Sequence, residues 1–153
     1  MPQNLTTRPA RARDAEVLAR LCLEWEGAPA RKSPELLLEL WVQTLSDDDS
    51  SVYLALEGEQ VLGFVHVTYQ ARPARLGWRA TLEELHVVAG VESATKSLLE
   101  RVVEECRRRG DVIALYLLTQ PDLEPHYGEG LYAELGFIPR GRDVLVWQGD
   151  LKG

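Results

Sequence analysis

Cysteine is scarce in this chain, which has only Cys22 and Cys106 among its 153 residues. The two lack the C-x-x-C spacing of redox and zinc motifs, and His66 and His126 lie too far apart to suggest a pair of metal ligands. We therefore expect no bound metal. Both cysteines are expected to be small buried side chains in the reducing cytoplasm, with a reactive thiol as the alternative.

Long apolar runs and an excess of basic residues are missing as well. No run approaches the length of a membrane span, and the polar start MPQNLTTRPARARD lacks the apolar segment of a signal peptide. The 24 acidic residues outnumber the 17 basic ones and give a net charge of −7. This balance argues against a nucleic-acid partner and is compatible with a neutral or cationic small substrate. We expect a cytoplasmic protein without a membrane partner.

Repeats and internal linkers are also absent, so the whole chain, 1–153, is expected to form a single domain. The apolar patterns predict strand 5–10, helix 14–26, a helix from Ser33-Pro34 to Leu45, hairpin 51–69, loop 71–79, strand 80–88, helix 93–109, strand 112–118, helix 125–135 and strand pair 137–148. A strand–helix–strand unit thus follows an antiparallel meander. This order predicts an α/β fold: a single mixed, mostly antiparallel sheet with a central parallel strand pair and helices on both faces.

The two N-terminal helices have recognisable start signals. Asp14 and Ser33 are the expected N-caps, and Pro34 suits the first turn of the second helix. The second helix is expected to bury one apolar stripe, formed by Leu36, Leu37, Leu40, Trp41 and Leu45.

The element order resembles that of the GCN5-related N-acetyltransferase (GNAT) family over nearly the whole chain. LYAELGF (131–137) is similar to the family's C-terminal helix motif, and TLEELHVV (81–88) resembles its central strand. The hairpin VYLALEGEQVLGFVHV, with Gly63, and the helix ending in RRRG also resemble family elements. The resemblance implies transfer of an acetyl group from acetyl-CoA to an amine of a small molecule or peptide.

The resemblance also implies roles for individual side chains. Tyr132 falls at the tyrosine that often protonates the leaving thiolate in this family, and the alternative is a buried core aromatic. On strand 80–88, alternation places Leu82, Glu84, His86 and Val88 on one face, unless a bulge changes the phase. Glu84 is favoured slightly over Glu83 as the general base, and His86 titrates near neutrality. Alternatively the two acids face solvent or pair with arginines of loop 71–79.

The family's cofactor loop, Arg/Gln-x-x-Gly-x-Gly/Ala, is not reproduced here. Gly90 falls at the Arg/Gln position, Ser93 and Thr95 stand where glycine or another small residue is usual, and the loop looks two residues shorter. The helix after it still offers N–H groups to a pyrophosphate, although Glu92 adds an anion at the same place. The expected acetyl-CoA contacts are Leu85, His86, Val87, Gly90, Ser93, Ala94, Thr95 and Lys96.

The acceptor cannot be identified from the sequence. Loop 71–79 and the two N-terminal helices are expected to wall its pocket, with Trp25, Trp41 and Trp78 as candidate lining. A non-catalytic member of the family, whose cleft binds another ligand or a partner protein, is the alternative to an enzyme. The oligomeric state stays open, with a homodimer among the alternatives.

Overall fold

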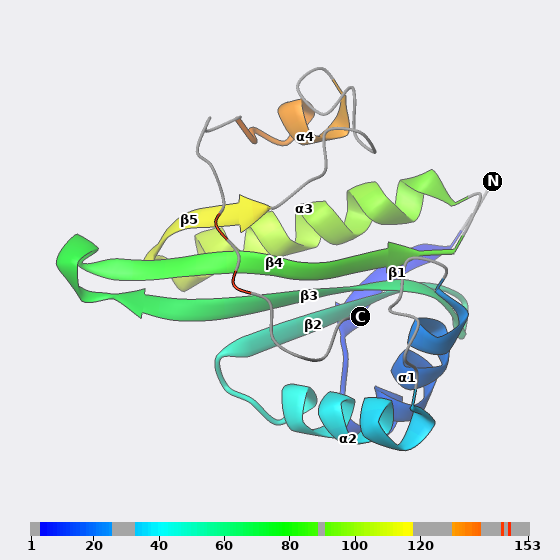
Figure 1. Ribbon diagram of the computed structural model, residues 1–153. Coiled ribbons are helices and arrows are strands. Elements are labelled where there is room, and N and C mark those ends of the chain that lie inside the picture. Colours follow the sequence, from blue (N-terminus) through cyan, green and yellow to red (C-terminus); the bar gives the residue numbers. More distant parts are fainter. Residues whose placement is uncertain are drawn as a thin grey trace.

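A mixed sheet with the strand order β1-β2-β3-β4-β5 runs through the molecule (Figure 1). The computed structural model describes residues 4–25, 33–88, 91–117 and 130–138, together with residues 145 and 147. The strands are β1 Leu5–Pro9, β2 Ser50–Glu57, β3 Gln60–Arg72, β4 Gly77–Val87 and β5 Val112–Leu117. The first three pairings are antiparallel and β4 pairs with β5 in parallel. The predicted mixed sheet and its parallel pair are confirmed.

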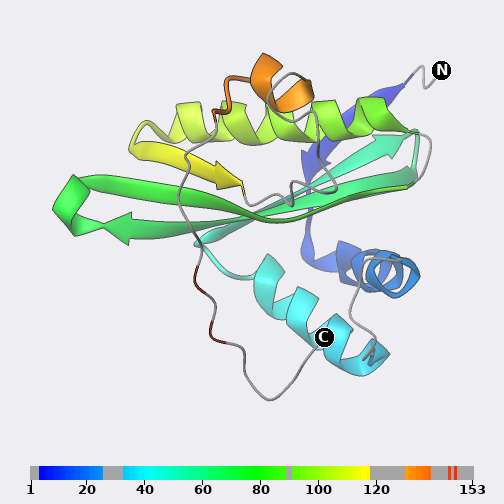
Figure 2. The same ribbon diagram turned by 45° about the horizontal axis from the view of Figure 1, so that its top comes forward.

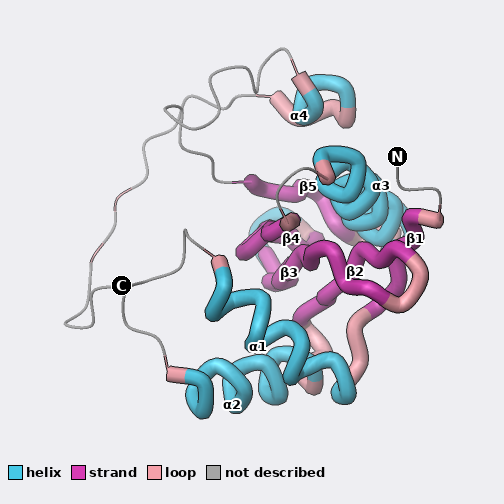
Figure 3. The backbone as a smooth tube through the Cα atoms, turned by 90° about the vertical axis from the view of Figure 1, so that its right-hand side faces the viewer, coloured by secondary structure: helices cyan, strands magenta, loops and turns pink. Residues whose placement is uncertain are grey.

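Helices cover both faces of this sheet, as predicted. The helices α1 (Ala15–Glu24) and α2 (Pro34–Leu45) lie on one face, and α3 (Glu92–Arg109) and α4 (Leu131–Glu134) lie on the other (Figures 2 and 3). Each face has its own apolar core. The core under α1 and α2 includes Leu18, Leu54 and Phe64, and the core under α3 includes Leu98 and Leu99. No helix in the described parts of the chain is long and apolar enough to cross a membrane.

The loop predicted at 71–79 is instead the tight end of the long β3–β4 hairpin. Strand pairing continues to Arg72 opposite Gly77, and only a short 3-10 turn, Pro73–Arg75, and Leu76 connect the two strands. Proline and glycine suggested a loop, but Gly77 has a packing reason, since a Cβ there would lie 2.6 Å from Ile113 Cγ2. The turn lies at the end of the sheet opposite α1 (Figure 1). The turn is thus not next to α1, and its role in walling an acceptor pocket stays a prediction.

Asp14 stands at the start of α1, but its carboxylate does not cap that helix. It accepts two hydrogen bonds from the Arg8 guanidinium, at 2.8 and 3.0 Å, and one from the Arg11 N–H at 2.7 Å. These bonds close a 3-10 turn, Ala12–Asp14, that precedes α1 and ties it to β1. The Arg8 hydrogen bonds are the main reason that the pKa of Asp14 lies below its usual value.

The α2 start is confirmed, whereas two of the five residues in its predicted apolar stripe are exposed. The Ser33 hydroxyl accepts a hydrogen bond from the Leu36 N–H at 3.3 Å, with Pro34 in the first turn. Leu36 and Leu40 are 45% and 48% exposed. The helix buries the narrower line Leu37, Trp41 and Leu45, spaced four residues apart.

The crossover helix α3 ends where the sequence predicts. The helix ends at Gly110, which has a φ of 79°, and Arg108 and Arg109 pair with Glu105 in its last turns. Cys22 and Cys106 are free thiols, and burial raises the pKa of both. His126, Gly90 and most of the predicted strand pair 137–148 lie outside the described residues.

Candidate active site

A β-bulge in the central strand decides which of its side chains face α1 and α2. In the β3–β4 register His66 pairs with Glu84 and Val67 with Leu82, so Glu83 is the extra residue. Leu82 belongs to the core under α3, whereas Glu84 lies beside His66 on the opposite face. Regular alternation would place Leu82 and Glu84 on one face, and the alternative stated with that prediction, a bulge that changes the phase, is the one the structure shows.

Glu84 lies next to a histidine rather than an arginine. Its Oε1 is 3.6 Å from His66 Nδ1, and its side chain remains 41% exposed. The guanidinium of Arg79 instead donates to Gln70. Among the described residues, no lysine or arginine forms an ion pair with Glu84. The carboxylate is thus open to solvent on one side and borders a titratable ring on the other.

His66 is the residue that sequence reasoning left out of the site. Its side chain is 12% exposed, its Nε2 lies 3.5 Å from Ser50 Oγ, and its ring meets Trp41 edge-on at 6.1 Å. Its Nδ1 is buried and makes no hydrogen bond within the described residues. The sequence carries a weak signal for it, because period-two alternation puts His66 on the same face of β3 as Phe64.

His86 lies two residues beyond Glu84 on the same face and is stacked on Trp25. The two ring centroids are 4.9 Å apart with an interplanar angle of 28°. Burial lowers the pKa of His86, and Glu24 opposes this shift only in part. Its ring is therefore mostly neutral at pH 7. Trp25 thus stands beside candidate site residues, and its place in an acceptor pocket stays a prediction.

The other two tryptophans of the predicted lining have different surroundings. Trp41 is buried in the core under α2 and packs edge-on against Phe64 at 5.1 Å. Trp78 packs against the core on the α3 side of the sheet. Trp78 therefore does not line the face that carries Glu84.

The N-terminus of α3 follows the end of β4 and has no side-chain cap. Val91 is its N-cap, and the Ala94 N–H donates to the Val91 carbonyl at 3.1 Å. The N–H groups of Glu92 and Ser93 have no acceptor within the helix itself. Thr95 is half-buried, while Ser93, Lys96 and Glu92 are exposed. The terminus therefore presents backbone donors, a hydroxyl and a cation, with one carboxylate among them.

Tyr132 and Glu84 lie on opposite faces of β4. Tyr132 is 8% exposed, belongs to the core under α3 and meets Phe137 edge-on at 6.1 Å. Leu85 and Val87 pack against the same core. Within the described residues the β4–β5 pairing ends at Leu82–Leu117, although β4 continues to Val87.

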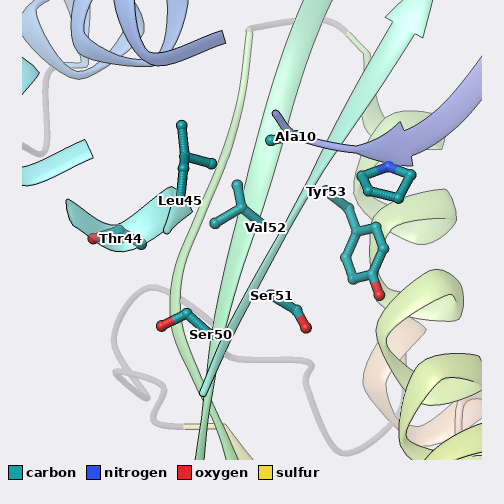
Figure 4. Close-up of a pocket in the computed structure, with 8 residues that line it drawn as sticks. Ala10, Thr44, Leu45, Ser50, Ser51, Val52 and Tyr53 are labelled. Carbon is teal, nitrogen blue, oxygen red and sulfur yellow. The ribbon is translucent and has the colours of Figure 1, made fainter. Parts of the chain in front are cut away.

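A separate pocket of about 160 Å³ opens at the start of β2 (Figure 4). It is lined by Pro9, Ala10, Thr44, Leu45, Ser50, Ser51, Val52 and Tyr53. The Ser50 and Ser51 hydroxyls point to opposite sides of the strand (Figure 4). Ser50, the hydrogen-bonding neighbour of His66, is therefore also part of the pocket wall.

Solved structures share this fold over almost the whole chain. A probable acetyltransferase has a TM-score of 0.82 and 19% identity, covering 95% of this chain and 99% of the other. A transcriptional regulator from Bacillus halodurans C-125 has a TM-score of 0.79 and 20% identity, with coverage of 95% and 99%. An aminoglycoside acetyltransferase from an uncultured soil metagenomic sample has a TM-score of 0.72 and 15% identity, covering 97% of each chain.

These likenesses establish the fold. It is the fold of the GCN5-related N-acetyltransferases, as the sequence resemblance predicts. No family model matches the sequence, and no curated protein matches it. Activity, cofactor and site roles therefore rest on the chemistry of the site itself.

Proposed function

We propose that this chain is an N-acetyltransferase that moves an acetyl group from acetyl-CoA to an amine of a small molecule or peptide. The observation that carries the proposal is the end of β4: beyond Leu82 its β5 side has no partner among the described residues, it carries an exposed carboxylate, and a helix N-terminus without a side-chain cap follows it in the chain. The whole chain, 1–153, acts as one domain, and the cytoplasm supplies acetyl-CoA.

The α3 terminus fits the pyrophosphate of CoA in part. Backbone N–H groups of Glu92 and Ser93, the Ser93 and Thr95 hydroxyls and the Lys96 ammonium are the groups that would bind it. The exposed carboxylate of Glu92 opposes this binding. Gly90 stays a predicted contact. The family's usual cofactor loop contains glycines, which leave more backbone N–H groups accessible to the pyrophosphate. This chain offers fewer such groups, so we expect it to bind CoA more weakly.

The chemistry divides between the two faces of β4. Glu84 takes the proton of the attacking amine, and the backbone N–H of Leu85 or Val87 stabilises the oxyanion. Tyr132 donates a proton to the departing thiolate from the α3 side. Bound acetyl-CoA would supply the thioester, and the enzyme contributes position, charge and proton transfer.

The surroundings of Glu84 support a cationic amine as acceptor. Trp25 and His86 form an aromatic wall, and Glu24 lies close enough to act electrostatically on His86. An aromatic face and two carboxylates attract an alkylammonium ion. The net charge of −7 acts in the same direction at longer range. Whether the protein works as a monomer or a homodimer stays a prediction to be tested by light scattering.

Titration with CoA tests the proposal. We expect millimolar CoA to raise the melting temperature, because a ligand at about 100 times its Kd stabilises a protein by about 2.7 kcal/mol. Glu92→Gln should tighten binding, more so at low salt, and Lys96→Ala should weaken it. If neither the parent nor Glu92→Gln responds to CoA, the site does not bind the cofactor. The non-catalytic alternative, a cleft for another ligand or partner protein, then replaces the enzyme.

A further inference from the structure

The sheet face that carries Glu84 continues past the two N-terminal helices. Three polar pairs follow one another along the β3–β4 hairpin: His66–Glu84, Thr68–Thr81 and Gln70–Arg79. The β3 members are every second residue of the strand, so the three pairs lie on the same face of the sheet. Figure 2 shows the hairpin extending beyond α1 and α2. Because the two threonines are half-buried and Gln70 is exposed, this stretch of the sheet presents polar side chains to solvent.

Arg79 is held above β4 by one neighbour on each side. Its guanidinium donates to the Gln70 side chain on β3, and its Cζ lies 5.6 Å from the ring centroid of Tyr116 on β5. Its Nε is buried and has no acceptor within the described residues. No aspartate or glutamate of the described residues forms an ion pair with it. The guanidinium therefore keeps its charge and has donors that an anion can satisfy once the side chain turns.

The two ends of this polar row carry opposite charges. At one end the Glu84 side chain is 41% exposed, and Glu24, the last residue of α1, acts electrostatically on the neighbouring His86. A helix C-terminus adds further negative potential there. At the other end alternation places Arg72 on the same face as Arg79, one pair nearer the turn. One end therefore attracts an ammonium ion and the other attracts an anion.

The distance between the two ends follows from the strand geometry. His66 and Gln70 mark the ends on β3 and are four residues apart. A strand rises about 3.3 Å per residue, so the Cα atoms of the two rows are separated by about 13 Å. Each bound ion stands about 3 Å from its partner, which leaves about 7–10 Å between an ammonium at Glu84 and an anion at Arg79. Two or three extended peptide residues span roughly this distance.

We propose that the acceptor carries a carboxylate about 7–10 Å from its reacting amine, and that Arg79 binds this carboxylate while Glu84 receives the amine. The inference rests on the proposed function and names the acceptor class, a short peptide or a long-chain amino acid. A planar guanidinium matches a carboxylate through two parallel hydrogen bonds. The hydroxyls of Thr68 and Thr81, between the two ends, suit polar groups along the acceptor. Arg79 determines specificity and takes no part in proton transfer.

Two pairs of acceptors test the carboxylate directly. Triglycine and triglycinamide differ in one group, a carboxylate against a neutral amide. With acetyl-CoA as donor and the released thiol as readout, kcat/KM should be about 10-fold higher for triglycine, because a charge-assisted bond is lost with the amide. Comparison of 8-aminooctanoate with n-octylamine repeats the test without peptide groups. A carboxylate preference in either pair supports the proposal, and the pair that shows it identifies the source of the carboxylate.

Variants of Arg79 test whether this side chain is responsible for the preference. Arg79→Gln should bring the triglycine-to-triglycinamide ratio of kcat/KM close to one, and Arg79→Lys should retain part of it, since the charge remains without the planar fork. A folding defect would lower both rates and leave the ratio unchanged. Arg107→Gln is the matched control, because Arg107 is exposed on α3, on the other face of the sheet, and its loss changes the net charge equally. Equal kcat/KM values for both members of each pair in the parent, or a preference that persists in Arg79→Gln, would overturn the proposal.

Thermal melts without CoA separate this inference from the proposed function. At equal, low ionic strength triglycine should raise the melting temperature of the parent more than triglycinamide does, and Arg79→Gln should abolish the difference. If CoA does not bind but this difference is found, the acetyltransferase proposal fails and the carboxylate site stands. If CoA binds and neither the melts nor the rates distinguish the two peptides, the proposed function stands and the carboxylate site is refuted.

Discussion

Replacement of Gly63 by alanine tests how closely β3 and β4 approach each other beside the site. A Cβ built on Gly63 would lie 2.4 Å from the His86 carbonyl oxygen, 2.9 Å from Val87 Cα and 3.0 Å from Val87 Cγ2. Ordinary contacts begin at 3.4 Å, so the nearest one requires the strands to separate by about 1 Å. Two of the three atoms belong to the backbone, so a change of rotamer cannot relieve the overlap.

The expected cost follows from two opposing effects. Overpacking of this kind destabilises by about 1–3 kcal/mol, and the upper half of that range applies because the backbone must move. Alanine also lowers the conformational entropy of the unfolded chain, which raises the free energy of unfolding by about 0.4–1 kcal/mol. The steric effect is larger, and we expect Gly63→Ala to lower the free energy of unfolding by about 2 kcal/mol.

Urea denaturation followed by circular dichroism measures this change. With an m-value of about 2 kcal/mol/M, the midpoint should fall by about 1 M urea. The double variant Gly63→Ala/Val87→Ala is the matched control: it removes the Val87 methyl contact and keeps both backbone contacts. It should recover none of the loss. A single variant as stable as the parent, or full recovery in the double variant, would show that the strands are not held this close.

Three further predictions concern single side chains. Asp14→Asn should lower the free energy of unfolding by about 2 kcal/mol in urea titrations, because it weakens the charge-assisted bonds from Arg8, whereas the exposed Glu16→Gln on the same helix should change little. Burial lowers the pKa of His86 in the folded protein below the ordinary value of about 6.5, so between these two pKa values the unfolded chain binds more protons than the folded one. The urea midpoint should therefore fall as the pH drops through that window. His86→Asn should make the urea midpoint less dependent on pH. Tyr132→Phe should lower kcat by roughly 10²-fold with little change in melting temperature, and a parent-like kcat would remove Tyr132 from the mechanism.

The sheet and its crossover could be predicted because their signals are local. The apolar strand at 112–118, the amphipathic helix before it and the glycine at its end together specify a parallel unit. The length of the β3–β4 hairpin could not be predicted in this way. Pro73 and Gly77 are common in loops, and only the pairing of Arg72 with Gly77 shows that the strands continue to the turn.

The candidate site could be predicted only in part. Glu84 and His86 were identified because they lie on the strand that the resemblance singles out. His66 was missed because its partner comes from another strand, and the pairing depends on a bulge that alternation alone does not reveal. The exposure of Leu36 and Leu40 was missed for a similar reason. The spacing of apolar residues along a helix predicts which side faces the sheet, but it does not predict how much of that side the sheet covers.

The bulge at Glu83 also determines where this strand tolerates a change in length. The extra residue is absorbed at one point, so the flanking pairs Val67–Leu82 and His66–Glu84 keep the orientation of neighbours in a regular ladder. Deletion of Glu83 would therefore straighten β4 and leave Glu84 beside His66. Deletion of Leu85 would turn His86 into the core under α3 and move Val87 beneath α1. Deletion of Glu83 is thus expected to be a mild change, whereas deletion of Leu85, two residues later, exchanges the faces on which the following side chains lie.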